Sequence, residues 1–199
     1  MIMTKNEFLT RFNLLQLTKS AHTYRHPSSL TSAAVLIGLT ESGSERQLQI
    51  LLTKRAKHLR HHPSQISFPG GKIESCDESV IDAALRETFE EIGVPQSAIK
   101  VLGQLPPYQT ISGFNVTPVV ALVAPKQPYQ VDDNEVAEVF HVPLQHFLNS
   151  NQAHVVVASK AGVPHKVHFL PYKHYNIWGA TAVMIKDLVA LLSDPLTHS

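Results

Sequence analysis

Three glutamates that lie close together in the sequence could bind a metal ion: Glu87, Glu90 and Glu91. On a helix that turns about 100° per residue, all three side chains project from one arc of about 100°. Such like charges repel, and each pair costs an isolated helix roughly 0.2–0.5 kcal/mol, a penalty that a divalent cation removes. Carboxylate oxygens are hard ligands that suit Mg²⁺ or Mn²⁺ rather than zinc, and the sequence contains no Cys cluster or HExxH pattern. We therefore predict a Mg²⁺ or Mn²⁺ site on this helix.

A second face of the same helix is mostly apolar, which predicts that it packs against a core. The residues of this stripe are Ile81, Leu85, Thr88, Phe89 and Ile92. Gly93 and Pro95 are typical of a helix end. The predicted helix therefore carries an acidic face for chemistry and an apolar face for packing.

Two glycines, Gly70 and Gly71, follow Phe68 and Pro69 and precede the helix. Because a glycine has no side chain, the backbone there can approach a ligand closely, so we predict that both glycines bind the substrate. A double glycine alone is more often an ordinary turn, and a lone Glu-Glu pair on a helix is usually a solvated face. The combination of glycines, loop, helix start and RExxEExG favours a functional site.

The stretch from Gly71 to Val94 resembles the Nudix box, which has a glycine, a spaced acid and then REUxEExGU, where U is apolar. The matching positions are Arg86, Glu87, Glu90, Glu91, Gly93 and Val94, and Thr88 is a polar departure at the first U. Glu78 lies the usual eight positions before Arg86, but Gly71 is then one residue farther from Glu78 than in the commonest form. Asp77 restores the spacing from Gly71 only by spoiling the spacing to Arg86.

A box loop that is one residue longer and contains an aspartate is similar to the branch of the Nudix family that hydrolyses coenzyme A. The segment 51–71 resembles the signature of this branch, LLTxRSxxLRxHxGQxSFPGG, with Ala56 in place of a common serine and Ser64 in place of a common glycine. Loss of that glycine would alter the backbone geometry of the loop. Trp178 belongs to a stretch that is similar to the closing IWGxTA of the same branch.

The resemblance implies a Nudix-type α/β/α sandwich with a mixed sheet. It also implies an enzyme that cleaves the diphosphate of coenzyme A, or of its thioesters, into 3′,5′-ADP and (acyl-)4′-phosphopantetheine. The same chemistry on ADP-ribose, a dinucleotide or a nucleoside triphosphate is an alternative. A ligand-sensing module without turnover is a third interpretation. Such modules typically lose carboxylates from the box, whereas this sequence keeps them.

The resemblance assigns roles to the acidic residues. The three glutamates of the helix would hold Mg²⁺ or Mn²⁺ ions that clamp the diphosphate and lower the pKa of bound water. Arg86 would orient a glutamate through charge-assisted hydrogen bonds. The group that takes the proton from water is a box glutamate, Glu90 or Glu91, or an acid of the run 132–138, with Glu135 first. The alternative for that run is a solvated loop.

Other residues around the box are candidates for substrate contacts. Basic residues between positions 54 and 62 could bind the 3′-phosphate of coenzyme A, and we select Arg55 and Arg60. Without the resemblance, this run is more simply a solvated loop. Glu78 either favours the positive end of the helix or reaches the metal ions. Trp178 could stack on adenine, although a large aromatic residue before a C-terminal helix is more often part of the core.

The composition indicates one compact domain that acts on a small molecule. With 199 residues, 43% of them hydrophobic, the chain can form a proper core. A net charge of +1 gives no general attraction to nucleic acid or to anionic membranes. A single cysteine, Cys76, excludes an internal disulfide, and no stretch approaches the ~20 apolar residues of a membrane span or the apolar core of a signal peptide. We therefore expect a cytoplasmic protein, and its oligomeric state stays open, with a homodimer as one option.

Strand and helix patterns are mixed without regular βαβ alternation, which predicts an α+β fold. We divide the chain into an N-terminal helix and connector, 1–29, and a Nudix hydrolase domain, 30–192. Apolar runs predict strands at 33–39, 48–53, 66–68, 99–105, 116–123, 139–142, 155–157 and 167–169. Helices are predicted after a capping box formed by Thr4 and Glu7, within the Nudix box, after Pro143 and from 178 to 192. Pro118 indicates an edge strand or a bulge.

Overall fold

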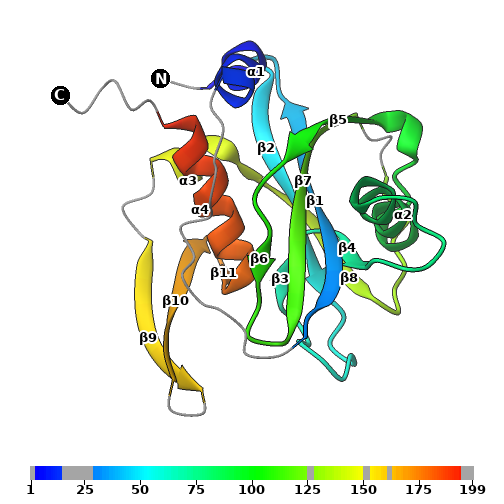
Figure 1. Cartoon of the computed structure of the whole chain (residues 1–199). Coiled ribbons are helices and arrows are strands. Elements are labelled where there is room, and N and C mark those ends of the chain that lie inside the picture. Colours follow the sequence, from blue (N-terminus) through cyan, green and yellow to red (C-terminus); the bar gives the residue numbers. More distant parts are fainter. Residues whose placement is uncertain (1–2, 15–28, 125–127, 150–152, 161–162, 194–199) are drawn as a thin grey trace.

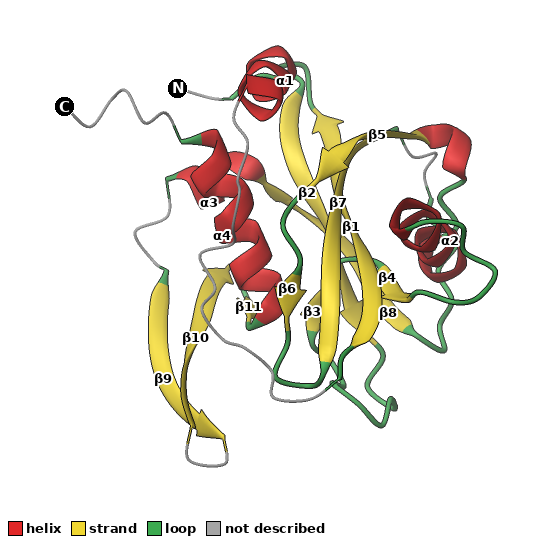
Figure 2. Cartoon of the chain, viewed as in Figure 1, coloured by secondary structure: helices red, strands yellow, loops and turns green. Residues whose placement is uncertain are grey.

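The protein folds into three layers, with a mixed β-sheet between helices (Figure 1). The structure is a computed structural model that describes residues 3–14, 29–124, 128–149, 153–160 and 163–193. Helix α2 (Val80–Ile92) covers one face of the main sheet, and α1 (Lys5–Leu14), α3 (Leu144–Leu148) and α4 (Ala180–Leu192) cover the other (Figure 2). A short 3-10 helix, Gln96–Ala98, follows α2. None of the helices in these residues is long and apolar enough to cross a membrane.

The main sheet is built from strands that precede and follow α2 in the sequence. Its strands are β1 (Thr31–Ser42), β2 (Gln47–Arg55), β3 (Ile66–Ser67), β4 (Gly70–Lys72), β5 (Ile99–Gln104), β6 (Tyr108–Gln109), β7 (Phe114–Val123) and β8 (Val136–Pro143). Within the described residues their order is β3-β2-β1-β7-β5, with β4 beside β1, β6 beside β7 and β8 beside β2. Strands β1 and β7 are parallel and the other pairs are antiparallel. The predicted α+β fold with a mixed sheet is therefore confirmed.

A second sheet, called the small sheet here, lies beside α4 and away from α2 (Figure 1). It contains β9 (His154–Lys160), β10 (Val163–Tyr172) and β11 (Tyr175–Trp178), in the order β11-β10-β9. The predicted hairpin is confirmed, because Val156 pairs with Val167 in antiparallel register. Its predicted turn at 162 lies partly outside the described residues. The predicted C-terminal helix that ends at Leu192 is confirmed, and it begins at Ala180, shortly after strand β11 ends at Trp178.

Strands β1 and β2 diverge, and the segment 66–72 fills the space between them. Strand β2 pairs with β3 through Thr53 and Ser67, whereas β1 pairs with β4 through Ala34 and Gly71. The double glycine therefore lies inside the sheet rather than in a loop. This position brings it under helix α2, and the active-site candidates gather at this point of divergence.

Two hydrophobic cores hold the layers together. One core lies between α2 and the main sheet and contains Leu36, Leu51 and Ile92. The other lies between the main sheet and the remaining helices and contains Ile37. Because neighbouring residues of β1 enter different cores, this strand is buried on both faces. Its continuous apolar run, rather than an alternating one, has this physical origin.

Helix α2 packs by a face that differs from the predicted stripe. Thr88 and Ile92 are fully buried, as predicted, but Phe89 is 56% exposed and Glu91 is only 3% exposed. The prediction that Phe89 packs against the core is therefore wrong. Ala84 is also fully buried and lets the helix approach the sheet closely on the side of Glu91. The buried face consequently includes a carboxylate.

Pro118 lies in the interior of the main sheet, so the prediction of an edge strand is wrong. Strand β7 has β1 on one side and both β5 and β6 on the other. The carbonyl oxygen of Pro118 accepts the N–H of Leu105, which lies in the gap between β5 and β6. The missing N–H of the proline points to the same side, where no continuous partner strand needs it.

Helix α1 packs into the larger core. Phe8 and Phe12 are buried there, with their ring centroids 5.7 Å apart. Arg11 Nη1 donates to the carbonyl oxygen of Leu192 at 2.6 Å. The predicted N-cap is confirmed, because the Thr4 hydroxyl accepts the N–H of the third following residue. Most of the predicted connector, 15–28, lies outside the described residues, and the division of the chain at residue 30 stays a prediction.

Candidate active site

Helix α2 begins and ends at residues that cap it, which fixes the position of its acidic side chains. The Ser79 hydroxyl accepts the backbone N–H of Asp82 at 3.2 Å and donates to the Asp82 carboxylate at 2.8 Å. Gly93 ends the helix in the left-handed region, with φ 70°, and its N–H bonds to the carbonyl oxygen of Phe89. The three glutamates therefore lie in the C-terminal half of a helix with both ends fixed.

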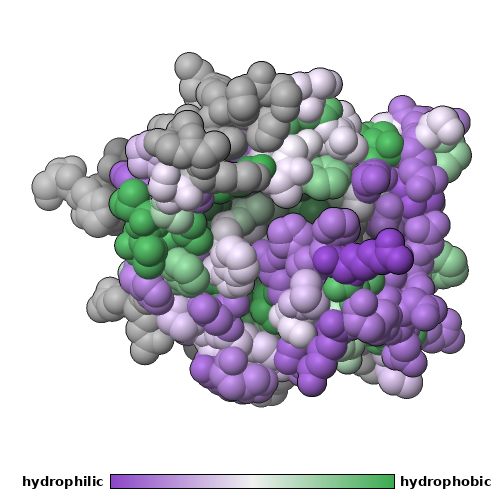
Figure 3. Space-filling model, turned by 90° about the horizontal axis from the view of Figure 1, so that it is seen from below, coloured by the Kyte–Doolittle hydropathy of each residue, from purple (hydrophilic) through white to green (hydrophobic). Residues whose placement is uncertain are grey.

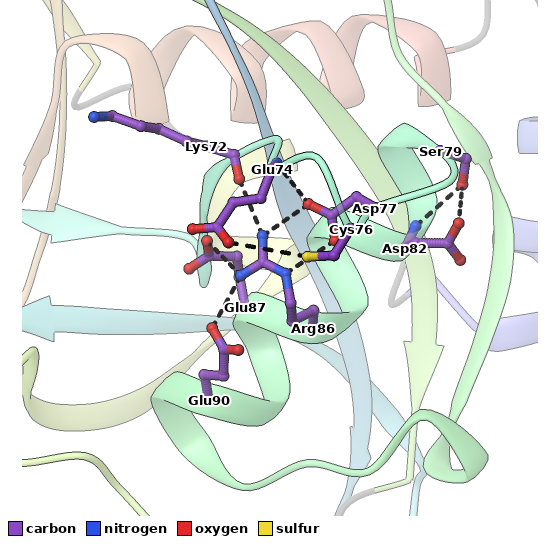
Figure 4. Close-up of polar contacts among 9 residues, drawn as sticks. All are labelled: Lys72, Glu74, Cys76, Asp77, Ser79, Asp82, Arg86, Glu87 and Glu90. Carbon is purple, nitrogen blue, oxygen red and sulfur yellow. Dashed lines mark hydrogen bonds and ion pairs between the residues drawn. The ribbon is translucent and has the colours of Figure 1, made fainter.

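Arg86 connects helix α2 to the loop before it (Figure 4). Its guanidinium donates to both carboxylate oxygens of Asp77, at 2.9 Å each, and to the carbonyl oxygen of Lys72 at 3.1 Å. Its Nη1 also donates to Glu87 and to Glu90, at 3.0 Å each. The hydrogen bond to Asp77 and then that to Glu87 raise the pKa of Arg86, and burial opposes the change. One arginine thus orients two of the three glutamates, as predicted.

Asp77, rather than Glu78, is the acid of the box loop that Arg86 binds. The Asp77 carboxylate also accepts the N–H of Glu74 at 2.8 Å, which closes a turn. The bond to Arg86 and then the bond to Glu74 lower the pKa of Asp77 to about 2. Glu78 is exposed. In this longer loop the turn, and not the usual spacing to Arg86, decides which acid meets the arginine.

Glu87 lies directly against the backbone of Gly71. A β-carbon at Gly71 would fall 2.5 Å from Cδ of Glu87, so only glycine leaves room for this carboxyl group. Burial raises the pKa of Glu87, and Arg86 opposes the change. At Gly70, a β-carbon would meet the carbonyl oxygen of Ala34 at 2.3 Å, and φ is 150°. The two glycines make room for the protein's own atoms, and their contact with substrate stays a prediction.

Glu91 turns into the sheet. Its carboxylate accepts the N–H of Gly70, but Oε2 has no hydrogen-bond partner among the described residues. Burial raises the pKa of Glu91 to about 8, the charges of Glu135 and Glu87 act in the same direction, and Arg55 opposes them. A buried carboxylate oxygen without a partner is unfavourable, so this atom is suited to a cation.

The three glutamates do not converge in this arrangement. Glu90 is exposed and Glu87 is partly buried, and both bond to Arg86, whereas the Glu91 carboxylate faces Gly70. In the part of the chain that the structure describes, no three His, Cys, Asp or Glu side chains lie close enough to hold a metal ion. The helix spacing therefore places all three glutamates near the C-terminal end of α2. Their carboxylates are separated because Glu87 and Glu90 bond to Arg86, whereas Glu91 bonds to the N–H of Gly70.

The residues of this acidic end nevertheless fit a divalent cation. Their donors are carboxylate oxygens, which Mg²⁺ and Mn²⁺ prefer. Glu91 offers the unpartnered Oε2, and Glu87 lies at the neighbouring glycine of the same strand. The charge of Glu87 raises the pKa of Glu91, and a bound cation would relieve this repulsion. The identity of the metal ligands stays a prediction.

The acidic loop, residues 132–135, lies against the end of helix α2. The N–H of Asp132 donates to the carbonyl oxygen of Glu91 at 3.0 Å. The carbonyl oxygen of Glu135 accepts the N–H of Ala56 at 2.8 Å. The Glu135 side chain is exposed, and its charge is close enough to raise the pKa of Glu91. The predicted base is therefore near the box, while its role stays a prediction.

The basic loop, residues 56–65, joins β2 to β3 beside the acidic loop. His58 Nε2 lies 3.1 Å from a carbonyl oxygen of the acidic loop. Arg60 is exposed on the basic loop, whereas Arg55 is partly buried at the end of β2, where its charge lowers the pKa of Glu91 against the effect of burial. Of the two predicted phosphate-binding arginines, Arg55 is thus near the carboxylates.

Ser64 keeps the backbone conformation that a glycine would favour. Its φ is 60°, in the left-handed region, and His62 two residues earlier has φ 54°. The serine adopts this conformation despite its cost of about 1–2 kcal/mol, and the expected change in loop geometry stays a prediction. The neighbouring Gln65 carbonyl oxygen accepts the N–H of Arg55 at 2.9 Å, which closes the base of the loop.

A mixed sheet between helices, with an arginine that holds an acidic helix over a double-glycine strand, defines the class of Nudix proteins. A model of the NUDIX domain matches residues 30–161. The chain belongs to the Nudix family and is an enzyme that acts on phosphorus-containing anhydrides.

Relatives that share most of their length with this chain have the same family name. The chain is 41% identical over 186 residues to a protein of Enterobacter sp. (strain 638) named uncharacterized Nudix hydrolase NudL, with 94% of this chain and 93% of the relative covered. A protein of the same name from Escherichia fergusonii is 40% identical over the same shares.

Solved structures show the same fold at lower sequence identity. The Nudix hydrolase RenU from M. smegmatis has a TM-score of 0.50 and 21% identity, with 66% of this chain and 80% of that chain covered. A MutT/nudix family protein from Enterococcus faecalis has a TM-score of 0.50 and 20% identity, with 94% and 68% covered. These likenesses show the fold alone.

Proposed function

We propose that this Nudix hydrolase cleaves the diphosphate of coenzyme A, or of its thioesters, into 3′,5′-ADP and (acyl-)4′-phosphopantetheine. The observation that carries the proposal is the buried, unpartnered Oε2 of Glu91, a carboxylate that is influenced by the charges of Arg55, Glu135 and Glu87. A diphosphate resists attack until its negative charge is neutralised, and this site combines cation ligands with basic side chains. The cytoplasm is the proposed compartment, in accord with a single cysteine in the sequence.

A divalent cation is part of this proposal, and Nudix hydrolases generally use Mg²⁺ or Mn²⁺. Glu87, Glu90 and Glu91 would hold it, because Glu91 has a free carboxylate oxygen and the other two share a single arginine. When bound, such an ion neutralises the diphosphate oxygens and lowers the pKa of a bound water.

Side chains of this protein supply the remaining steps. Arg86 orients Glu87 and Glu90, and it keeps helix α2 fixed to the box loop. Glu135 takes the proton from the attacking water, since its exposed carboxylate is near Glu91. Arg55 binds the diphosphate close to the carboxylates, because its charge already acts on Glu91.

The choice of coenzyme A rests on the basic loop and on its sequence signature. Coenzyme A carries a 3′-phosphate on its ribose, which ADP-ribose lacks. Arg60 is exposed on the basic loop and can bind this group from solvent. Hydrolysis of ADP-ribose or of another nucleoside diphosphate derivative uses the same carboxylates, so the two proposals differ only in the role of this loop.

Product analysis tests the chemistry. With Mg²⁺ or Mn²⁺, the wild-type protein should release 3′,5′-ADP from coenzyme A, and Glu90→Gln and Glu91→Gln should each lower kcat by about 10²- to 10⁴-fold. Glu78→Gln is the matched control, because Glu78 is an exposed acid of the same box, and Arg86 does not bind it. Equal product release by the wild type and both active-site variants would refute the proposed site.

A substrate pair tests the basic loop. Arg60→Gln should raise KM for coenzyme A about 10-fold and leave KM for 3′-dephospho-coenzyme A unchanged, because only the first substrate offers the phosphate. Lys100→Gln, which removes an exposed charge from β5, should change neither value. If the wild-type protein hydrolyses ADP-ribose with a higher kcat/KM than coenzyme A, the coenzyme A proposal is refuted and the alternative substrate is favoured.

A further inference from the structure

Trp178 lies at the surface, beside the part of the chain that leads into the active site. It ends strand β11, and its side chain is 38% exposed. The expectation that this residue belongs to the core is therefore wrong. The other expectation is contact with a substrate base, and rings and amides surround this tryptophan.

One side of the Trp178 ring is occupied by the small sheet itself. Phe169 lies opposite Trp178 on β10, with ring centroids 6.2 Å apart and planes inclined by 17°. His154 lies opposite Phe169 on β9, with centroids 5.0 Å apart and planes inclined by 2°. Because β11 and β9 are the edges of this sheet, Trp178 and His154 are the two ends of a stack of three rings. A further planar group can extend the stack at the Trp178 end, where the indole ring is partly exposed.

The Trp178 end of the stack is held next to the end of the basic loop. Strand β11 packs beside β3. A β-carbon at Gly179 would lie 3.9 Å from Nε2 of Gln65, which is the last residue of the basic loop. The Thr181 hydroxyl donates to the carbonyl oxygen of Ile66 at 3.1 Å and fixes the start of α4 to the start of β3. Trp178 therefore has a fixed position relative to this loop.

The same loop leads to the catalytic carboxylates. Gln65 bonds through its carbonyl oxygen to the N–H of Arg55, and the charge of Arg55 acts on Glu91. Gln65 and Arg55 thus connect Trp178 to the proposed diphosphate site. His154 lies on the opposite edge of the small sheet. Seen from below, hydrophilic residues dominate the right of the molecule, where α2 and the basic loop lie, and a hydrophobic patch covers the β9–β10 hairpin at the left (Figure 3).

The groups around Trp178 suit a purine base. An indole ring stacks on any base through its flat face. Asn176, two residues before Trp178 on β11, is exposed on the same side of the strand, and the amide of Gln65 is on the loop beside it. Amides can both donate and accept hydrogen bonds at the edge of a base. A flexible pantetheine arm has amides that can also form hydrogen bonds, but it offers no flat ring to stack on the indole.

We propose that the exposed part of the Trp178 ring stacks on the adenine base of the nucleotide substrate, while the diphosphate lies at helix α2. The inference rests on the proposed function, because coenzyme A supplies the adenine, and it identifies the specificity-determining residue of that site. Arg60 is exposed on the basic loop, whose base is closed by the bond between Gln65 and Arg55.

Fluorescence tests the contact without turnover, because Trp178 is the single tryptophan of the chain. In the presence of Mg²⁺, 3′,5′-ADP should quench the emission of Trp178 in a saturable manner, and 4′-phosphopantetheine, which has no base, should leave it unchanged. Equal quenching by both products would overturn the proposal in favour of the pantetheine arm. Absence of quenching by 3′,5′-ADP at concentrations that inhibit the enzyme would also overturn it.

Kinetics separates stacking from a structural role. Trp178→Ala should raise KM for coenzyme A roughly 10- to 100-fold with little change in kcat, and Trp178→Phe should restore most of the loss. Val157→Ser is the control, because this residue is 67% exposed on β9, and its side chain lies outside the ring stack. A fall in kcat in both Trp178 variants with unchanged KM would contradict the proposal.

The two proposals can fail separately. If the wild type cleaves no coenzyme A, the proposed function fails, and titration with adenosine 5′-phosphates of different length still decides whether Trp178 binds a base. If coenzyme A is cleaved and Trp178→Ala keeps the wild-type KM, the proposed function stands and the stacking proposal fails.

Discussion

Arg86 binds three carboxylates and one carbonyl oxygen. Its bonds to Asp77 and Lys72 hold helix α2 to the box loop, and its bonds to Glu87 and Glu90 orient these side chains. Two of these carboxylates, on Glu87 and Glu90, are proposed metal ligands. The third, on Asp77, is not a proposed ligand, and its two hydrogen bonds would keep Arg86 in place if Glu87 and Glu90 bound a cation. The acid of the box loop would then position the arginine rather than bind metal.

The ion pair of Asp77 and Arg86 predicts a dependence of stability on pH. The folded-state pKa of Asp77 is about 2, below the ordinary value of 3.8. A lowered pKa stabilises the fold fully above the ordinary value, and this contribution is lost as the pH falls through the folded value. Asp77→Asn should therefore lower the melting temperature at pH near 6, and its difference from the wild type should shrink below about pH 4.

Thermal denaturation at a series of pH values measures this difference, and Asp133→Asn, an exposed acid of the acidic loop, is the control. A difference between Asp77→Asn and the wild type that stays constant from pH 6 down to the acid limit would contradict the assignment.

Gly71→Ala tests the space that Glu87 occupies. The new β-carbon would fall 2.5 Å from the Glu87 carboxyl carbon, so this carboxylate must move. We expect metal-dependent activity to fall at least 10-fold, with an unfolding free energy lowered by about 1–3 kcal/mol. Isothermal titration with Mn²⁺ should show weaker binding.

Gly43→Ala separates space from backbone strain. Gly43 has φ 72°, but no atom lies within 4 Å of its ideal β-carbon. This variant should lose about 1–2 kcal/mol of stability and keep full activity. Equal activity of the two variants would show that Glu87 does not need the space at Gly71.

At the scale of elements, apolar runs predicted the long strands and the hairpin of β1 and β2, because buried strands need such runs. The short strands β4, β6 and β11 were missed. Strand β4 consists of Gly70, Gly71 and Lys72, which carry no apolar pattern, and it exists because β1 and β2 diverge and leave their edges unpaired. For β4, tertiary pairing rather than local sequence creates the strand.

The sequence predicted the residues of the site that share one helix face, but not those that depend on a turn or on packing. Spacing in the Nudix box identified Arg86 and the three glutamates, since helix periodicity fixes which residues share a face. The spacing could not identify Asp77, because a turn in the loop decides it, or the burial of Glu91, because the packing of small alanines against the sheet decides it. Exposure of Trp178 depends on the small sheet, which the sequence did not reveal in full.

Helix α2 offers a test of its observed buried face. Thr88 is fully buried, and its hydroxyl donates to the carbonyl oxygen of Ala84 at 2.7 Å, a backbone group that the helix already satisfies. Thr88→Val should therefore change the unfolding free energy by less than about 1 kcal/mol, whereas Thr88→Asp should lower it by more than about 3 kcal/mol. Phe89→Asp, at the exposed neighbour, should cost less than about 1 kcal/mol. Similar losses of unfolding free energy for Thr88→Asp and Phe89→Asp, measured by urea denaturation, would contradict the burial of Thr88 and the exposure of Phe89.

At the scale of the whole molecule, the larger core joins parts of the chain that are far apart in the sequence. Helix α1 and helix α4 meet in this core, and Arg11 bonds to the last turn of α4. The small sheet packs on the same helix α4 through Leu170 and Ile177. Displacement of α4 would therefore disturb α1 and the Trp178 surface together, although neither is part of the Nudix box.

Phe8→Ala tests whether α1 unfolds with the rest of the protein. Phe8 is fully buried, and its loss should lower the unfolding free energy by about 3–5 kcal/mol if α1 and the main sheet form one cooperative unit. Leu14→Ala, on the same helix with 76% of its side chain exposed, should cost less than about 1 kcal/mol. Urea denaturation followed by Trp178 fluorescence reports on the small sheet, and circular dichroism reports on all helices. Coincident transitions at a lowered midpoint would include α1 in the domain, whereas an unchanged fluorescence midpoint would support the predicted boundary near residue 30.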